Sequence, residues 1–247
     1  AGEFIAVSSK LEVPHPPGAP FYLLLGRFFS FFSFGDPEKI ALAINFLSVV
    51  SSAFTILFLF WTITYLTSKI IKTDSFNNIL LVLISGLTGA LTFTFTDSFW
   101  FSAVEAEVYA MSSFFTAFVF WAILRWESSQ NNKIQNRWII LIAYMMGLSI
   151  GVHLLNLVAI PALALIIYFK KTKKISLLGL IFSLALGLIV IGFIVEGIIP
   201  GLPSLASFLE RLFVNSFGLP FGSGIIIFIL FFISFLSYLI WYSQKKE

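Results

Sequence analysis

Five side chains that could take part in acid–base chemistry or bind an anion lie in the polar segments of an otherwise apolar chain. They are Glu3, His15, Glu105, Glu107 and His153. A carboxylate can take the proton of an attacking hydroxyl, and an imidazole can exchange a proton or contact a phosphate. Polar residues also collect wherever a membrane protein meets water, so each candidate has an ordinary structural alternative. We predict catalytic roles for the three glutamates and for His15.

His15 stands in the run Pro-His-Pro-Pro-Gly-Ala-Pro at residues 14–20. Proline lacks an amide N–H, fixes its own φ and pushes the preceding residue out of the α region, so this run predicts a stiff loop. Such a loop would hold one imidazole in a defined place, although a stiff loop that packs against the membrane would look the same. Neither histidine has a partner at a metal-ligand spacing such as His-x-x-x-His, and we therefore expect no metal site.

Glu105 and Glu107 stand at the expected start of a spanning helix. Carboxylates are favoured there by the helix dipole and by unpaired N–H groups, so N-terminal capping explains them structurally. Two residues apart on a helix, their side chains would point about 200° apart, and at most one of them would face the same way as Tyr109. The functional alternative is that one glutamate orients an acceptor or a sugar hydroxyl, with Tyr109 lining the acceptor groove.

Arg27, His153 and Asn156 are the candidates for holding a donor phosphate. Arg27 interrupts the apolar stretch 21–34 and could bind phosphate through paired N–H groups, or it could extend to the headgroups. His153 suits an anion if it is protonated, or it could cap the last carbonyls of the preceding helix. Asn215 lies in the last outer loop, where we predict a contact with the acceptor or its groove.

The composition is that of a polytopic membrane protein. Hydrophobic residues make up 59% of the 247 residues, charged residues 11%, and phenylalanine alone occurs 31 times, with a mean hydropathy of +0.99. The absence of cysteine excludes disulfides, thiolate metal sites and cysteine nucleophiles. Nothing in the sequence indicates nucleic-acid binding or a cofactor.

The hydropathy pattern predicts an all-α bundle in a single transmembrane domain over residues 1–247. We expect a first outer loop at 1–39, with an interfacial helix near 21–34, and an outer loop at 196–223 with a second interfacial helix. A hydrocarbon core of ~30 Å needs about 20 apolar residues per span. About seven spans are expected, at residues 40–68, 77–96, 105–125, 137–153, 155–169, 175–195 and 224–243.

The distribution of basic residues predicts the orientation. Eleven of the fifteen lysines and arginines fall on one side of this topology, which the positive-inside rule makes cytoplasmic. The N-terminus is then outside and the C-terminus inside. The candidate residues would all gather at the outer face, and a membrane protein that collects carboxylates and histidines at one face is building a site there.

Several short motifs occur in an order that resembles a known family. They are Gly-Glu-Phe-Ile at 2–5, His-Pro-Pro-Gly-Ala-Pro at 15–20, Leu-Leu-Gly-Arg at 24–27, the stretch 99–109, Gly-Val-His-Leu-Leu-Asn at 151–156 and Asn-Ser-Phe-Gly-Leu-Pro at 215–220. Together they resemble the bacterial membrane family known as domain of unknown function 2723, which is related to protein O-mannosyltransferases of the GT-C glycosyltransferase fold.

The resemblance implies an enzyme that moves one sugar, with mannose the leading expectation, from a polyprenyl-phosphate donor to serine or threonine hydroxyls of proteins. The reaction would take place outside the bacterial cytoplasmic membrane, in a single displacement with inversion. In the family the catalytic base is an aspartate two residues before Gly2, so it would immediately precede Ala1, with Glu3 beside it. We therefore expect the sequence to be a fragment that lacks a first helix and this base.

Two other functions remain open from the residues. The same fold could act on a lipid or glycan acceptor. A transporter or flippase could use the carboxylates at the membrane edge, although no charge falls in mid-span and no pair of broken helices marks a midplane site.

Overall fold

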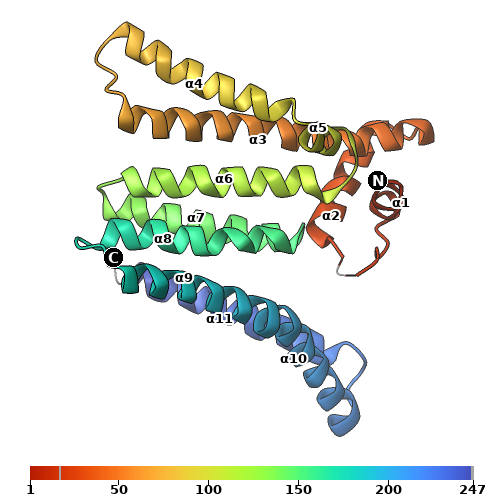
Figure 1. Cartoon of the computed structure of the whole chain (residues 1–247). Coiled ribbons are helices and arrows are strands. Elements are labelled where there is room, and N and C mark those ends of the chain that lie inside the picture. Colours follow the sequence, from red (N-terminus) through yellow and green to blue (C-terminus); the bar gives the residue numbers. More distant parts are fainter. Residues whose placement is uncertain (17, 246–247) are drawn as a thin grey trace. The chain divides into compact units, whose positions relative to one another are not determined.

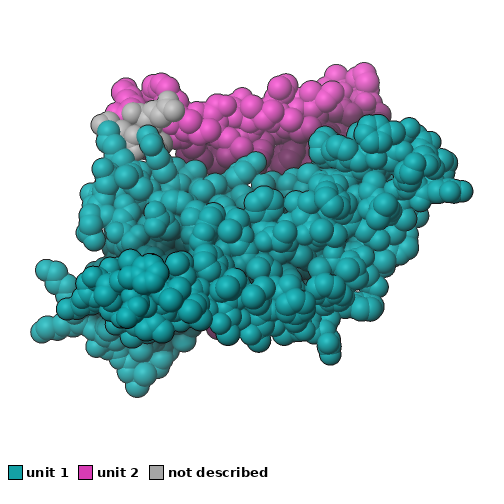
Figure 2. All heavy atoms as spheres, turned by 90° about the horizontal axis from the view of Figure 1, so that it is seen from above, with its two compact units in different colours: residues 1–187 teal, residues 188–247 magenta. Residues whose placement is uncertain are grey.

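The computed structural model describes residues 1–16 and 18–245, and these residues are almost entirely helical, with no strand (Figure 1). The chain divides into two compact units, residues 1–187 and residues 188–247 (Figure 2). The prediction of an all-α polytopic membrane bundle is confirmed. A single transmembrane domain across both units stays a prediction.

The helices of the first unit follow the hydropathy runs and add short helices at one end of the bundle. They are α1 (Gly2–Lys10), α2 (Pro20–Ser30), η1 (Phe31–Ser33), η2 (Pro37–Lys39), α3 (Ile40–Ile70), α4 (Phe76–Thr94), α5 (Asp97–Val104), α6 (Val108–Ser128), α7 (Asn132–Ile150), η3 (Leu154–Val158) and α8 (Ala159–Lys171). Helix α9 (Leu177–Gly192) crosses the division between the units. The second unit continues with η4 (Phe193–Ile198), α10 (Ile199–Arg211), η5 (Leu212–Ser216) and α11 (Ser223–Lys245).

Six helical segments in the described part of the chain are long and apolar enough to cross a membrane, one fewer than the seven spans expected. They are Pro37–Ile70, Phe76–Thr94, Val108–Ser128, Leu154–Lys171, Leu177–Ser216 and Ser223–Tyr242. Helix α7 accounts for the difference, because its first turns carry Lys133, Gln135, Asn136 and Arg137. It nevertheless packs along α6, one of the six candidate spans.

The segment 196–223, expected as an outer loop, is helical as far as Ser216. Helices α9, η4, α10 and η5 form one helical run of 40 residues, about twice the length a single span requires. Pro200 lies in the first turn of α10, where proline is tolerated, and the widened π turns of η4 come just before it. The residues expected to form a second interfacial helix lie in α10 and η5, and their position at the membrane interface stays a prediction.

Within the second unit, α10 packs against α11. The carboxylate of Glu210 accepts hydrogen bonds from the backbone N–H groups of Gly222, at 2.5 Å, and Ile225, at 3.0 Å. These groups lie at the start of α11, where N–H donors have no partner inside the helix. A buried glutamate of α10 therefore caps α11 and joins the two helices.

In the first unit, α3 lies between α4 and α6, and α6 in turn contacts α7 and α8 (Figure 1). Helices α1, α2 and α5 gather at the end of the bundle where α6 begins. The core there contains Phe4 of α1, Tyr22 and Leu23 of α2, and Met111 and Phe115 of α6. Burial of these large side chains holds the polar first segment against the spanning helices.

Candidate functional site

Glu3 and His15 contact each other at the end of the first unit where α6 begins. The Glu3 carboxylate accepts the backbone N–H of His15 at 2.9 Å, and its other oxygen lies 2.7 Å from Nδ1 of the ring. The backbone N–H of His15, followed by its side chain, lowers the pKa of Glu3 below the ordinary value. Glu3 therefore stays ionised at neutral pH, and its exposed carboxylate can accept a hydrogen bond from an incoming hydroxyl.

The start of α1 lies beside Glu107, since the backbone nitrogen of Ala1 contacts the Glu107 carboxylate. This contact brings Glu107 close to the segment that carries Glu3, although 104 positions separate the two glutamates in the sequence. Tyr22, fully buried, packs its ring edge against Phe4 at 5.3 Å. Burial raises the pKa of the Tyr22 hydroxyl, which remains a neutral group under the site.

Glu105 and Glu107 do not start the helix as expected. Helix α6 begins at Val108, Glu105 ends α5, and the Glu107 N–H donates to the Glu105 carbonyl at 2.8 Å. Glu107 occupies the N-cap position of α6, but its side chain caps no N–H group. The bend between α5 and α6 therefore replaces the helical geometry assumed for the pair, and capping does not explain the Glu107 carboxylate.

His153 and Tyr109 form a second group, with ring centroids 5.6 Å apart. Nδ1 of His153 accepts the backbone N–H of Leu155 at 3.1 Å, so the ring caps the start of η3. The structural alternative, capping of the preceding helix through its carbonyls, is therefore wrong. With Nδ1 engaged as an acceptor, Nε2 is the ring nitrogen that can donate to a ligand.

Gly151 joins the turn before His153 to the proline-rich loop. Its carbonyl accepts the N–H groups of Phe21, at 2.8 Å, and Tyr22, at 3.4 Å, in the first turn of α2. These donors have no partner within α2, so the turn after α7 supplies one. A Cβ atom on Gly151 would lie 2.8 Å from Cβ of Phe21, closer than two side chains can pack. The close approach requires glycine here.

Gly151→Ala should therefore destabilise the fold by about 1–3 kcal/mol, because the first turn of α2 must move away and lengthen its hydrogen bonds. The matched control is Gly147→Ala in the last turn of α7, where an added Cβ meets nothing within 4 Å. Alanine favours a helix over glycine, so the control should be neutral or stabilising. Unfolding of both variants in detergent, followed by tryptophan fluorescence, would measure the difference; equal stabilities would contradict the packing argument.

Arg27 has a structural partner. Its Nη1 donates to the carbonyl of Ser9 near the end of α1, and its guanidinium lies 4.9 Å from the ring centre of Phe31. The side chain thus ties α1 to α2 rather than extending freely to the headgroups. Four N–H donors of the guanidinium remain for another ligand.

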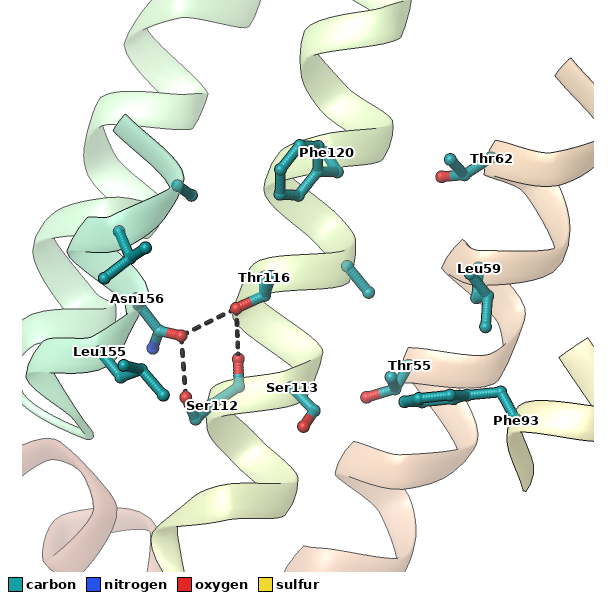
Figure 3. A pocket seen from close by; sticks show the side chains of 13 residues that line it. Thr55, Leu59, Thr62, Phe93, Ser112, Ser113, Thr116, Phe120, Leu155 and Asn156 are labelled. Carbon is teal, nitrogen blue, oxygen red and sulfur yellow. Dashed lines mark hydrogen bonds between the residues drawn. The ribbon is translucent and has the colours of Figure 1, made fainter. Parts of the chain in front are cut away.

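Asn156 is buried and faces a cavity of about 680 Å³ between α3, α6 and the η3–α8 segment (Figure 3). Its Oδ1 accepts the hydroxyls of Ser112, at 2.8 Å, and Thr116, at 2.9 Å. No described residue accepts a hydrogen bond from its Nδ2. The cavity wall carries no charged side chain, and exposed Leu155 forms part of it. An apolar chain that enters from the bilayer fits this cavity.

Ser112 and Thr116 were not among the predicted residues. They lie four positions apart in an apolar helix, a spacing that puts two hydroxyls on one face and could have indicated them. Asn215 lies in η5 of the second unit and is not part of the group that the first unit brings together. Among residues 1–16 and 18–245, no three histidine, aspartate or glutamate side chains are placed to hold a metal ion.

Comparison with known proteins places this arrangement in a family. Residues 1–176 match the model of the protein O-mannosyl-transferase TMEM260 N-terminal domain. The chain belongs to this family. The resemblance to protein O-mannosyltransferases drawn from the short motifs is thus confirmed.

Two curated relatives carry the same name. The chain is 30% identical over 117 residues to protein O-mannosyl-transferase tmem260 of Dictyostelium discoideum, which covers 47% of the chain. It is 25% identical over 188 residues, 75% of the chain, to protein O-mannosyl-transferase TMEM260 of Mus musculus. The matched parts span 13% and 24% of those relatives. No solved structure matches the chain.

Proposed function

We propose that the protein is a GT-C-type membrane glycosyltransferase that moves mannose from a polyprenyl-phosphate donor to serine or threonine hydroxyls of proteins, with inversion. The observation that carries the proposal is that the Glu3–His15 pair and Glu107, which contacts the backbone nitrogen of Ala1, lie at the same end of a membrane bundle of this family. A protein hydroxyl needs a nearby carboxylate to take its proton, since it is a poor nucleophile while protonated.

Different carboxylates deprotonate and orient the acceptor hydroxyl. The family resemblance implies an aspartate as the general base, and Glu107 lies beside the start of α1. Glu3, held in place by two contacts to His15, accepts a hydrogen bond from the acceptor and orients it. Glu105 lies at the bend before α6, and Tyr109 lies in the first turn of α6. Both border the same acceptor region.

The donor enters from the bilayer. Its polyprenyl chain occupies the uncharged cavity beside Asn156, whose rim opens to the lipid side at Leu155 and Val158. Nε2 of His153 donates to the phosphate, and His153 lies three residues from Asn156 along the chain. Arg27 of α2, which contacts the end of α1, adds a positive charge. Cationic or donor groups at the leaving phosphate ease its departure.

The site is proposed to face the extracytoplasmic side. Its support is the excess of basic residues at the other ends of the spanning helices. Assignment to the bacterial cytoplasmic membrane rests on the motif resemblance alone, since both named relatives are eukaryotic. Asn215 stays a prediction for the acceptor groove.

The test uses the natural full-length protein in lipid vesicles. Polyprenyl-phosphate-linked radiolabelled mannose is supplied with a peptide rich in serine and threonine, or with the same peptide bearing alanine at those positions. Label on the first peptide alone supports the proposal. Label that enters only the lipid fraction or a glycan would show that the acceptor is not a protein. The absence of any transfer would contradict the proposal that the protein is a mannosyltransferase.

A further inference from the structure

A second cavity, of about 450 Å³, lies near the opposite end of α3 and α6 from the candidate site. It is lined by Trp61 and Tyr65 of α3, Trp121 and Arg125 of α6, and Trp138 of α7, together with Thr64 and Ser68. Arg125 follows Glu107 by 18 residues along α6, a rise of about 27 Å. The cavity is therefore distant from the carboxylates of the proposed reaction, and it shares no lining residue with the cavity beside Asn156.

The three tryptophans of this cavity converge from three helices. The ring centroids of Trp61 and Trp121 are 5.4 Å apart, and those of Trp121 and Trp138 are 5.5 Å apart. Tryptophans at a membrane interface commonly face the headgroups singly, as anchors. Here they contact one another and form an aromatic wall, and the rings are too close to hold a cation between them. The wall offers apolar faces and indole N–H donors.

Hydrogen-bond donors without acceptors surround the cavity. In the described part of the chain, no group accepts a hydrogen bond from the guanidinium of Arg125 or from the indole N–H of Trp61, Trp121 or Trp138, and Arg125 is exposed. The nearby carboxylate of Glu127 is already engaged, by Lys69 at 2.5 Å and by the Tyr65 hydroxyl at 2.9 Å. The free groups of Arg125 and the three indoles are all donors, and Arg125 carries a positive charge, so together they suit an anion with several oxygens.

We infer that this cavity binds the phosphate group of an anionic membrane lipid. Arg125 holds the phosphate oxygens through paired N–H contacts, and the tryptophan wall covers the glycerol and the first part of the acyl chains. A lipid is the occupant because the cavity lies between helices that can cross the membrane, at the end where basic residues gather. Basic pockets between such helices are known sites for lipid headgroups.

The experiment titrates the full-length protein in a neutral detergent with phosphatidylglycerol whose acyl chains carry bromine, a quencher of tryptophan fluorescence. Saturable quenching is expected for the wild-type protein, and phosphatidylcholine with the same brominated chains should give none at equal concentration. Arg125→Gln should weaken phosphatidylglycerol binding roughly tenfold or more, because a charge-assisted contact is lost. Arg125→Lys should lie between the two, since lysine keeps the charge but loses the paired contacts.

Arg137→Gln is the matched control, because Arg137 is an exposed arginine of α7 that does not line the cavity. It should change the affinity less than twofold. Equal losses for both variants, or equal quenching by phosphatidylcholine, would overturn the inference in favour of diffuse attraction to the bilayer. If millimolar inorganic phosphate competed with the lipid, the natural ligand would be a soluble phosphate compound and not a lipid. Unchanged thermal unfolding of Arg125→Gln shows that the variant is folded, as expected for an exposed side chain.

Discussion

Glu3→Gln should lower the turnover number for mannose transfer by about two orders of magnitude while leaving the folded protein nearly as stable as before. Glutamine keeps the size of the side chain and can still accept the backbone N–H of His15, but it loses the charge that orients an acceptor hydroxyl. The apparent KM for the lipid-linked donor should stay the same, because Glu3 does not contact the donor in the proposed site.

Glu12→Gln is the control for this experiment. Glu12 lies in the same first segment, is exposed, and makes a single 4.0 Å ion pair with Lys10. Its removal should leave both turnover and stability unchanged, since such surface pairs contribute little. Full activity of Glu3→Gln would show that Glu3 does not take part in the reaction. Equal losses of turnover in both variants would indicate a general effect of charge in the first segment.

Lys170→Met should destabilise the first unit by about 2 kcal/mol. The Lys170 ammonium donates to the carbonyls of Trp126, Glu127 and Ser129 at 2.7, 2.8 and 2.9 Å, at the point where α6 ends. It also lies 4.5 Å from the centre of the Trp126 ring. Methionine fills a similar volume but leaves three carbonyls without this donor, and it removes the contact that joins the end of α8 to the end of α6.

The neighbouring lysine provides the comparison for that variant. Lys171 is exposed and has no partner among the described residues, so Lys171→Met removes the same charge without removing a contact. Chemical unfolding of the two variants in matched detergent would measure the difference in the free energy of unfolding. If both variants lost the same stability, net charge at this end of the bundle would be the cause, and the three hydrogen bonds would contribute nothing.

The spanning helices could be predicted from the sequence because hydropathy is a local signal. A run of about 20 apolar residues forms a helix in a membrane, since a helix satisfies the backbone hydrogen bonds within the run itself. The break expected between the spans 137–153 and 155–169 corresponds to the turn before η3, where His153 caps the next helix. Helix α7 shows the limit of this signal. Its polar first turns lower its mean hydropathy below that of a spanning helix. Its packing on α6 cannot be predicted from its own residues.

The candidate residues could be named from the sequence, but their contacts could not. The Glu3–His15 pair depends on how the proline loop folds back over α1, and the Gly151–Phe21 hydrogen bond joins segments far apart in the chain. Arg27 could equally have extended to the headgroups, and only the position of α1 shows that it binds the Ser9 carbonyl. These contacts depend on tertiary packing, which cannot be predicted from residue type and spacing.

The hydrogen bond between Gly151 and Phe21 has a consequence for the synthesis of the protein. The ribosome adds Gly151 130 residues after Phe21, which takes roughly 6–26 s at about 5–20 residues per second. Throughout that time α2 lacks the carbonyl that accepts its first N–H groups. The proline-rich segment therefore reaches its final position late, after α3 to α7 have been made, and until then its apolar residues are exposed to chaperones and proteases.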